Sequence, residues 1–201
     1  MCEVVIVIPA AGASSRMRGR DKLLEEVEGM PLLARQAAMA ARTGCAVLVT
    51  LPEGGGARHA VLGDDPAVAV TCLEDAPEGI AASIRAGARW AAGRRADGLM
   101  VVLADLPELE SADLERMVEG FGQAPDRVLR ATDITGRAGH PVIFPARLFP
   151  ALGRTEGDIG AKTLLRSEDI RTLPLPDRRA TTDLDTPEAW AAWRKAKAKG
   201  P

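Results

Sequence analysis

The chain has 201 residues, a formal net charge of −2, 46% hydrophobic residues and 27% charged residues. This length accommodates one well-buried α/β domain and is short for two, and the near-neutral charge gives no electrostatic reason to expect binding to nucleic acid or to a membrane surface. No apolar run is long enough to span a bilayer, and only three residues precede the first expected strand. We therefore expect a cytoplasmic protein without a signal peptide.

The cysteines and aromatic residues exclude further classes. Cys2, Cys45 and Cys72 are scattered and form no C-x-x-C pair, so the sequence predicts neither a zinc site nor a redox motif. Cys45 and Cys72 lie in or beside apolar strand-like runs, and we expect both to be buried, reduced thiols. Tyrosine is absent and other aromatic residues are few, which leaves little surface for stacking the bases of single-stranded nucleic acid.

The N-terminal stretch carries the strongest single pattern. The β-branched run Val4 to Ile8 is too continuous for a strand with one wet face, so it predicts a strand buried on both faces of a parallel sheet. Pro9 ends the strand, and the small residues 10–15 that follow let backbone N–H groups approach a ligand closely. Four basic residues come next: Arg16, Arg18, Arg20 and Lys22. The combination predicts a phosphate cradle, and the alternative is a tight strand-to-helix turn with solvated basic residues.

The next elements alternate between helix and strand. The Ala-rich segment 30–42 begins with Pro and stops before Gly44, which predicts a helix, and 45–51 is a second buried strand. The segment 52–56 contains three glycines, but no Lys-Ser/Thr pair follows to complete a P-loop. We interpret it as a flexible connection to a third strand at 68–73.

Three residues in the middle of the chain lie where a ligand would bind. In the predicted helix 76–92, Gly79 and Ser83 lie near the N-terminus, where backbone or hydroxyl donors can meet a sugar or phosphate. The buried strand 99–104 delivers Asp105 to its carboxyl end, the edge at which open parallel sheets bind ligands. The alternative for this aspartate is a cap on the next turn.

The C-terminal half continues the alternation. Its expected elements are strands at 128–132, 142–144 and 170–175, a polar loop at 133–139, and helices that begin near 157 and 187. Asp158 lies in the first turn of the first of these helices, and Thr186 with Pro187 gives a strong start signal for the second, which places Asp185 just outside it. Strands alternating with helices predict a three-layer α/β/α sandwich with a mostly parallel sheet of Rossmann-like type.

The candidate chemistry is charge stabilisation. A phosphate cradle together with Asp105 and Asp185 indicates a nucleotide whose phosphates are bridged by Mg²⁺, an ion that takes few carboxylates plus phosphate oxygens and water. The histidines are His59 and His140, and their surroundings give no Ser-His-Asp or Cys-His arrangement. Positioning and charge stabilisation are how phosphoryl and nucleotidyl transfer largely work.

A set of motifs spread from the first strand to the last helix makes a resemblance specific. The sequence resembles the nucleotidyltransferases related to molybdenum cofactor guanylyltransferase, and within them most closely the molybdenum cofactor cytidylyltransferases. The matching motifs are Pro9-Ala-Ala-Gly-x-Ser-x-Arg-Met17 with Lys22, Gly79-x-x-x-Ser83, Asp105-Leu-Pro107, Gly139-His-Pro141, Gly157-Asp-x-Gly-Ala161 and Leu184-Asp-Thr-Pro-Glu188.

The resemblance implies transfer of CMP from CTP to the terminal phosphate of molybdopterin, with Mg²⁺ as cofactor, pyrophosphate as product and a molybdenum enzyme as client. It implies a single nucleotidyltransferase domain over 1–201, of the nucleotide-diphospho-sugar-transferase-like type, with the nucleotide in the N-terminal half and the acceptor at about 133–165. The implied nucleotide contacts are Pro9, Ala10, Ala11, Gly12, Ser14, Arg16, Lys22, Gly79 and Ser83. The implied catalytic residues are Arg16, Lys22 and Asp105, the metal ligands Asp105 and Asp185, and the acceptor contacts Gly139, His140 and Asp158.

The base preference rests on one position. The resembled cytidylyl enzymes carry Pro-Ala-Ala-Gly where the guanylyl enzymes carry Leu-Ala-Gly-Gly, and the methyl group of Ala11 narrows the space that faces the base edge. The sequence therefore predicts CTP over GTP. One departure concerns Arg18, which stands where the family usually has Gly, so the local path of the loop needs a structure.

Three alternatives remain open at this stage. The protein could be a guanylyltransferase, another cytidylyl or sugar-phosphate nucleotidyltransferase, or a non-catalytic chaperone that binds the molybdenum cofactor. A dinucleotide-binding oxidoreductase is disfavoured because the first loop lacks G-x-G-x-x-G.

Overall fold

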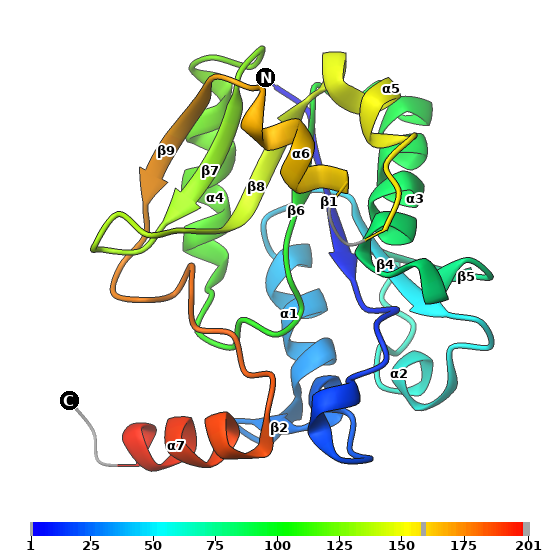
Figure 1. Ribbon diagram of the computed structural model, residues 1–201, viewed down its shortest axis with the longest axis vertical. Helices are drawn as coiled ribbons and strands as arrows, with labels where there is room; N and C mark the ends of the chain where they lie inside the picture. Colours follow the sequence, from blue (N-terminus) through cyan, green and yellow to red (C-terminus); the bar gives the residue numbers. More distant parts are fainter. Residues whose placement is uncertain (1, 158–159, 199–201) are drawn as a thin grey trace.

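The computed structural model describes residues 2–157 and 160–198 and shows a seven-stranded sheet with helices on both faces (Figure 1). The strands of the sheet are β1 (Val4–Pro9), β4 (Val47–Pro52), β5 (Val68–Leu73), β6 (Gly98–Val101), β7 (Val128–Thr132), β8 (Ala138–Pro145) and β9 (Ile170–Pro174). A separate hairpin is formed by β2 (Glu26–Val27) and β3 (Met30–Pro31). The helices are α1 (Leu32–Ala41), α2 (Gly56–Ala60), α3 (Ile80–Gly93), α4 (Ser111–Gly122), α5 (Phe149–Leu152), α6 (Gly160–Arg166) and α7 (Pro187–Lys197).

The strand order places the ligand-binding edge. The order is β5-β4-β1-β6-β8-β7-β9, and β8 runs antiparallel to both of its neighbours while the other pairs are parallel. From β1 the chain proceeds outward to β4 and β5, and it then returns to lay β6 on the other side of β1. The loops that follow β1 and β6 therefore diverge at a topological switch point, which is where α/β sheets bind ligands. The predicted α/β sandwich with a mostly parallel sheet is confirmed.

The central strand β1 divides the core into two halves. Val4, Ile6 and Ile8 pack with the apolar faces of α1 and α4, while Val5 and Val7 pack with α3 and α5 on the opposite face. All five side chains are at most 4% exposed. Burying each contributes about 1.5–3 kcal/mol, so this strand is a principal source of stability as well as the support for the loop that follows it. The prediction of a strand buried on both faces is confirmed.

The helix α4 lies between two predicted elements and was not singled out in the sequence. Its side chains Leu114, Met117 and Phe121 are fully buried at helical spacing. A capping box begins it, with the Glu110 backbone N–H donating to the Asp113 carboxylate at 3.1 Å. This helix completes the cover of one face of the sheet beneath β6, β8 and β7.

The prediction of buried thiols is wrong for Cys72, which is exposed, and Cys45 is only half-buried; both are free cysteines. The reason is strand order, because β5 forms an edge of the sheet and is much less covered than β1.

The predicted loop at 133–139 is also shorter than expected, because β8 already begins at Ala138. Across the described residues, no helix combines the length and apolarity that a membrane crossing demands.

The C-terminal helix α7 anchors the segment that precedes it. The Thr186 side chain accepts a hydrogen bond from the Ala189 N–H at 3.2 Å, which confirms the predicted N-cap. Trp190 is 1% exposed and donates through Nε1 to the Leu184 carbonyl at 3.1 Å. Arg194 pairs with Glu25 beside the β2–β3 hairpin, next to which α7 lies in Figure 1. These contacts hold the chain around 184–186 below the carboxyl edge of the sheet.

Candidate functional site

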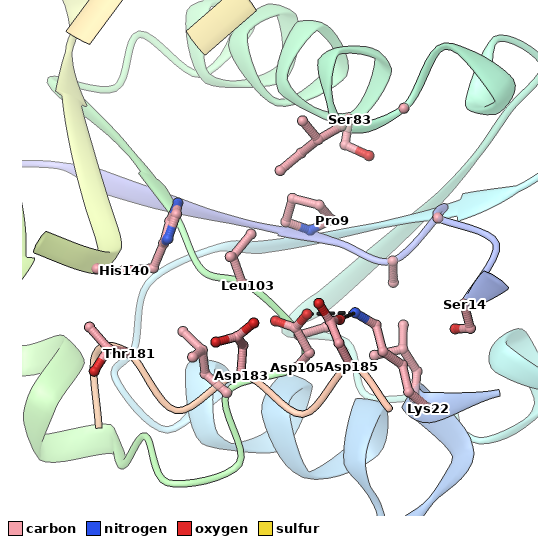
Figure 2. Close-up of a pocket in the computed structure, with 18 of the residues that line it drawn as sticks. Pro9, Ser14, Lys22, Ser83, Leu103, Asp105, His140, Thr181, Asp183 and Asp185 are labelled. Atoms are coloured by element: carbon pink, nitrogen blue, oxygen red, sulfur yellow. Dashed lines mark hydrogen bonds and ion pairs between the residues drawn. The ribbon is translucent and has the colours of Figure 1, made fainter. Parts of the chain in front are cut away.

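A pocket of about 720 Å³ lies at the carboxyl ends of the central strands (Figure 2). Its walls come from the loop after β1, the start of α3, the segment after β6, the β7–β8 hairpin and the segment 180–185. The sequence-predicted site residues that line it are Pro9, Ala10, Gly12, Ser14, Arg16, Lys22, Gly79, Ser83, Asp105, Gly139, His140 and Asp185. Ala11 lines an adjoining cavity instead, and Asp158 lies outside the described residues. The fold thus brings together positions from all parts of the chain.

The centre of the pocket is a lysine held by two carboxylates. Lys22 Nζ lies 2.6 Å from Asp105 Oδ2 and 2.6 Å from Asp185 Oδ1, and a guanidinium nitrogen of Arg16 lies 2.8 Å from Asp185 Oδ2. The Leu184 backbone N–H donates to the Asp105 carbonyl at 3.2 Å, which places the two aspartates side by side. Burial lowers the pKa of Lys22, but the charge and hydrogen bonds of Asp105 and the hydrogen bond of Asp185 outweigh it and hold this pKa above its ordinary value. The ammonium is therefore charged at neutral pH.

The two aspartates fit a hard cation. Asp105 Oδ1 is buried and has no hydrogen-bond partner among the described residues, although a buried carboxylate oxygen normally has one. No cluster of three acidic, histidine or cysteine side chains suited to a metal was found in 2–157 and 160–198. A cation bound here would take two protein carboxylates and fill its remaining positions with phosphate oxygens and water, which is the preference of Mg²⁺.

The loop after β1 is braced from behind by Arg58, a residue that the sequence did not point to. Arg58 lies in α2, directly after the glycine segment 52–56, and it is 6% exposed. Its guanidinium donates to Asp21 Oδ2 at 2.6 Å, to the Ala10 carbonyl at 2.6 Å and to Ser14 Oγ at 3.1 Å. Burial would raise the pKa of Asp21, but hydrogen bonds from Arg58 and from the Leu23 N–H hold it below its ordinary value. The loop is consequently fixed by buried charge-assisted hydrogen bonds.

The sequence around α2 has no helical periodicity by which this short helix could be predicted. The helix has five residues and follows Gly54 and Gly55, both at positive φ. The partners of Arg58 lie 37 and 48 residues away along the chain, at Asp21 and Ala10. The one local feature that could have indicated the role of Arg58 is an arginine directly after a run of small residues.

Arg18, which stands where the resembled family usually has Gly, adopts the backbone conformation of a glycine. Arg18 has φ 53° and ψ 48°, in the left-handed region that Gly adopts most easily, and Gly19 follows at φ 87°. Its guanidinium lies 2.6 Å from the Glu188 carboxylate in α7. The loop therefore keeps a glycine-like backbone, at a cost of about 1–2 kcal/mol for a residue with a Cβ.

The other wall of the pocket is the start of α3. Gly79 is the N-cap of this helix with φ 83° and ψ −153°, a conformation that residues with a Cβ avoid. Ser83 is 1% exposed, and its Oγ accepts a hydrogen bond from Thr50 Oγ1 at 2.8 Å. The Ser83 hydroxyl is thereby oriented and keeps its own proton for donation. The cavity that contains Ala11 shares Gly12, Ala13 and Gly79 with the main pocket.

The wall opposite the loop is formed by β8 and the segment 180–185. A Cβ on Gly139 would lie 2.0 Å from the Ala180 carbonyl oxygen, so only glycine permits this approach of the two backbones. The His140 backbone N–H donates to the same carbonyl at 3.0 Å. Figure 2 shows the His140 ring and Thr181 together on one side of the three charged groups Lys22, Asp105 and Asp185.

A second buried brace joins this wall to the β7–β8 hairpin. Asp133 is 2% exposed and accepts hydrogen bonds from Thr135 Oγ1 at 2.6 Å, from Thr181 Oγ1 at 2.8 Å and from the Arg137 N–H at 3.1 Å. The Thr135 hydrogen bond is the largest influence, and with the Thr181 and backbone bonds it outweighs burial and lowers the pKa of Asp133 to about 2. Asp133 thus ties the hairpin to the chain that carries Asp185.

Comparisons with known proteins agree with this geometry. A family model described as "MobA-like NTP transferase domain" matches residues 6–172. The purine catabolism protein PucB of Bacillus subtilis is 29% identical over 200 residues, covering 94% of this chain and 95% of that protein. A probable molybdenum cofactor guanylyltransferase of Synechococcus elongatus is 31% identical over 189 residues, covering 90% and 94%.

Solved structures share the same architecture. Rv0371c of Mycobacterium tuberculosis H37Rv superposes with a TM-score of 0.80 at 27% identity, covering 96% of this chain and 98% of that one. A structure of Rv0371c complexed with manganese matches with a TM-score of 0.74 at 26% identity, covering 96% and 99%. A CMP-2-keto-3-deoxy-manno-octonic acid synthetase complexed with CTP matches in fold, with a TM-score of 0.75 at 16% identity over 99% and 100%.

Arg58→Gln should destabilise the protein and weaken nucleotide binding, because it leaves Asp21 half-buried without its cation. We expect a loss of about 3 kcal/mol in the free energy of unfolding, at the low end for removing one partner of a buried ion pair, and a rise of the nucleotide KM. Urea unfolding and initial rates measure these effects. Arg89→Gln is the control, since Arg89 is exposed on α3 and outside the main pocket, and such a substitution should change the free energy of unfolding by at most about 0.5 kcal/mol. Equal behaviour of the two variants would contradict the bracing role.

Asp133→Asn should reduce stability in a pH-dependent way. The pKa of Asp133 is about 2 in the folded protein against an ordinary 3.8, so its charged form stabilises the fold above about pH 4 and this contribution disappears as the pH falls through 2. Urea unfolding should show a wild-type advantage at pH 6 that shrinks towards pH 3. Asp64→Asn, at an exposed position, serves as the control. A difference that stays constant between the two pH values would refute the assignment.

Proposed function

The chain belongs to the MobA-like NTP transferase family, and on that premise we propose that this NTP-dependent nucleotidyltransferase transfers CMP from CTP to the terminal phosphate of a molybdopterin-type acceptor. The observation that carries the proposal is Lys22 held between Asp105 and Asp185 beside the basic loop, at the switch point of the sheet. We further propose that residues 1–201 act as one nucleotidyltransferase domain. A molybdenum enzyme would be the client that receives the product.

The proposed reaction needs no general base. A phosphate monoester has its second pKa near 6, so the acceptor phosphate is already an anionic nucleophile at neutral pH. One of its oxygens attacks the α-phosphorus of CTP, a new P–O–P bridge forms, and the bond from the α-phosphorus to the oxygen that bridges to the β-phosphorus breaks to release pyrophosphate. The chief obstacle is repulsion between two anions. Arg16 and Lys22 lie in the pocket with the positive charge that offsets this repulsion.

Asp105 and Asp185 would hold Mg²⁺, whose chemistry is to neutralise charge on the phosphate oxygens of the bound nucleotide. The unpartnered Oδ1 of Asp105 supports this assignment. Around the metal, Lys22 would keep both carboxylates in place through the hydrogen bonds that it already donates. The nucleotidyltransferases of this family typically use a divalent metal, in line with the manganese in the Rv0371c structure.

The base would lie in the cavity that adjoins the main pocket. Ala11 lines that cavity and is 7% exposed, packing with Leu73 and Ala82, so its methyl group cannot swing away from a ligand. A purine needs more space at this wall than a pyrimidine, which favours CTP over GTP. The ribose would then lie across Gly79 and Ser83, and the triphosphate along Pro9 to Ser14 with Arg16 and Lys22.

The acceptor would lie on the opposite side of the charged centre. We propose contacts from Gly139, His140 and Asp158 within the acceptor-binding stretch at about 133–165. The alternative is a different phosphorylated acceptor or GTP as donor. PucB, which is named for purine catabolism, favours this alternative, and so does the relative named a probable molybdenum cofactor guanylyltransferase. PucB covers 94% of this chain and the guanylyltransferase covers 90%.

Asp105→Asn should abolish turnover while leaving the fold intact. Because the variant removes one negative charge from the proposed metal site and weakens the hold on Lys22, we expect a loss on the order of 100-fold or more in kcat/KM. The measurement is pyrophosphate release from CTP, Mg²⁺ and molybdopterin. Asp169→Asn is the control, since Asp169 is 78% exposed, pairs with Arg127, and neither residue lines the pocket. A wild-type protein that binds CTP or acceptor but never releases pyrophosphate would instead be a non-catalytic chaperone.

The base preference predicts the outcome of a thermal-shift panel. With Mg²⁺ and each of CTP, GTP, ATP and UTP, we expect CTP to raise the Tm most, by about 5–10 °C at one hundred times its Kd. Ala11→Gly should narrow the gap between CTP and GTP, because it removes the methyl group that limits the cavity. A larger shift with GTP for the wild type would overturn the cytidylyl assignment.

A further inference from the structure

Arg130 on β7 is a half-buried arginine that lines the reaction pocket without an acidic partner. Its Nε donates to the Gly139 carbonyl oxygen at 3.1 Å, and no ion pair joins it to any carboxylate in the part of the chain that the structure describes. Burial alone lowers the pKa of its guanidinium. A cation taken out of water without an anion costs free energy, so this arrangement needs a physical reason.

Three other arginines with partly or fully buried side chains carry carboxylate counter-ions, whereas the half-buried Arg171 bonds the Gly120 carbonyl and Gln123 Oε1 and does not line the main pocket. Arg58 pairs with Asp21, Arg85 with Asp75 and Glu78, and Arg179 with Glu110 and Asp113. These pairs lie behind or outside the main pocket. Arg130 instead donates its Nε–H to the Gly139 carbonyl, which fixes the plane of its guanidinium. Its two terminal nitrogens are left to donate to another partner. A fixed guanidinium with both terminal nitrogens available matches the geometry of a phosphate.

A second arginine lines the pocket from the same hairpin. Arg137 precedes β8 and is exposed, and its backbone N–H is held by Asp133 at 3.1 Å. Arg130 faces Val142 in the register of β7 and β8, and it bonds the residue immediately before His140. Figure 2 shows His140 on one side of the Lys22, Asp105 and Asp185 cluster and Ser14 on the other. The pocket therefore receives arginines from the β7–β8 hairpin and basic residues from the loop after β1, and three carboxylates also line it, Asp105, Asp183 and Asp185. Figure 2 shows Asp183 between Thr181 and Asp105.

We propose that Arg130, assisted by Arg137, binds the phosphate monoester of the acceptor. This inference rests on the proposed nucleotidyl transfer and names the group by which the acceptor is recognised. The arginines of the hairpin are distinct from the basic residues of the loop after β1, so a triphosphate held by Arg16 and Lys22 leaves Arg130 for a second anion. The acceptor phosphate is held there as it approaches the α-phosphorus of the nucleotide. The site selects acceptors that carry a phosphate over their dephosphorylated forms.

Calorimetric titration with inorganic phosphate tests the subsite directly. The protein is first saturated with α,β-methylene-CTP and Mg²⁺, which fills the triphosphate end with a nucleotide that cannot react. Arg130→Gln should weaken phosphate binding at least tenfold, the loss expected from removing a charge-assisted pair of hydrogen bonds, and should leave affinity for the nucleotide analogue within twofold. Arg130→Lys keeps the charge but not the fork and should give an intermediate affinity. It is also the second variant if Arg130→Gln fails to fold.

Arg89→Gln, at an exposed position on α3 outside the main pocket, is the matched control and should bind phosphate like the wild type. Unchanged phosphate affinity in Arg130→Gln, or no phosphate binding to the wild type beside the bound analogue, would overturn the inference and leave the proposed function standing. If the analogue itself does not bind, the proposed function fails. The phosphate titration without nucleotide then tests the subsite. A tenfold loss of phosphate affinity in Arg130→Gln supports the subsite, and an affinity equal to that of the wild type refutes it.

Discussion

The structure depends on one ammonium group placed between two carboxylates. Lys22 joins Asp105 and Asp185 across separations of 83 and 163 residues, so a single side chain connects the first loop, the end of β6 and the segment before α7. Without a cation the two carboxylates would repel each other at the edge of the sheet. With it they form a compact polar centre, and Asp105 Oδ1, which is buried and has no partner among residues 2–157 and 160–198, fits the proposed binding of a hard cation.

The centre is held in place by buried braces behind the pocket walls. Arg58 fixes the loop after β1 through Asp21 and the Ala10 carbonyl, and Asp133 fixes the opposite wall through Thr181. Both braces are charged groups satisfied by several hydrogen bonds, which is the condition under which buried charge gives a rigid site. Positioning of this kind suits a reaction in which the substrates already carry the nucleophile and the leaving group.

Membership of the MobA-like family assigns a reaction class, nucleotidyl transfer from an NTP. Relatives with different names, PucB and a molybdenum cofactor guanylyltransferase, match nearly the whole chain, so the shared architecture serves more than one named role. The differences should therefore lie at the acceptor end and in the base cavity. In our proposals, the charge of Arg130 selects the acceptor and the methyl group of Ala11 limits the space for the base.

The sequence by itself predicted the buried strand β1 and the start of α7, and it proposed Asp105 and Asp185 as metal ligands, but it did not predict β2, β3, α2 or α4. The β-branched run of β1, the cap at Thr186 and the position of Asp105 at a strand end are local patterns whose physical reasons act over a few residues. Only the tertiary structure decided the features that depend on strand order and on contacts between distant residues, such as burial at the sheet edge and the partners of the arginines. Cys72 is exposed because β5 lies at an edge. The fold brings the carboxylate of Asp21 to Arg58, whereas Arg130 meets the Gly139 carbonyl. Pairing between residues far apart leaves no periodic trace in the chain.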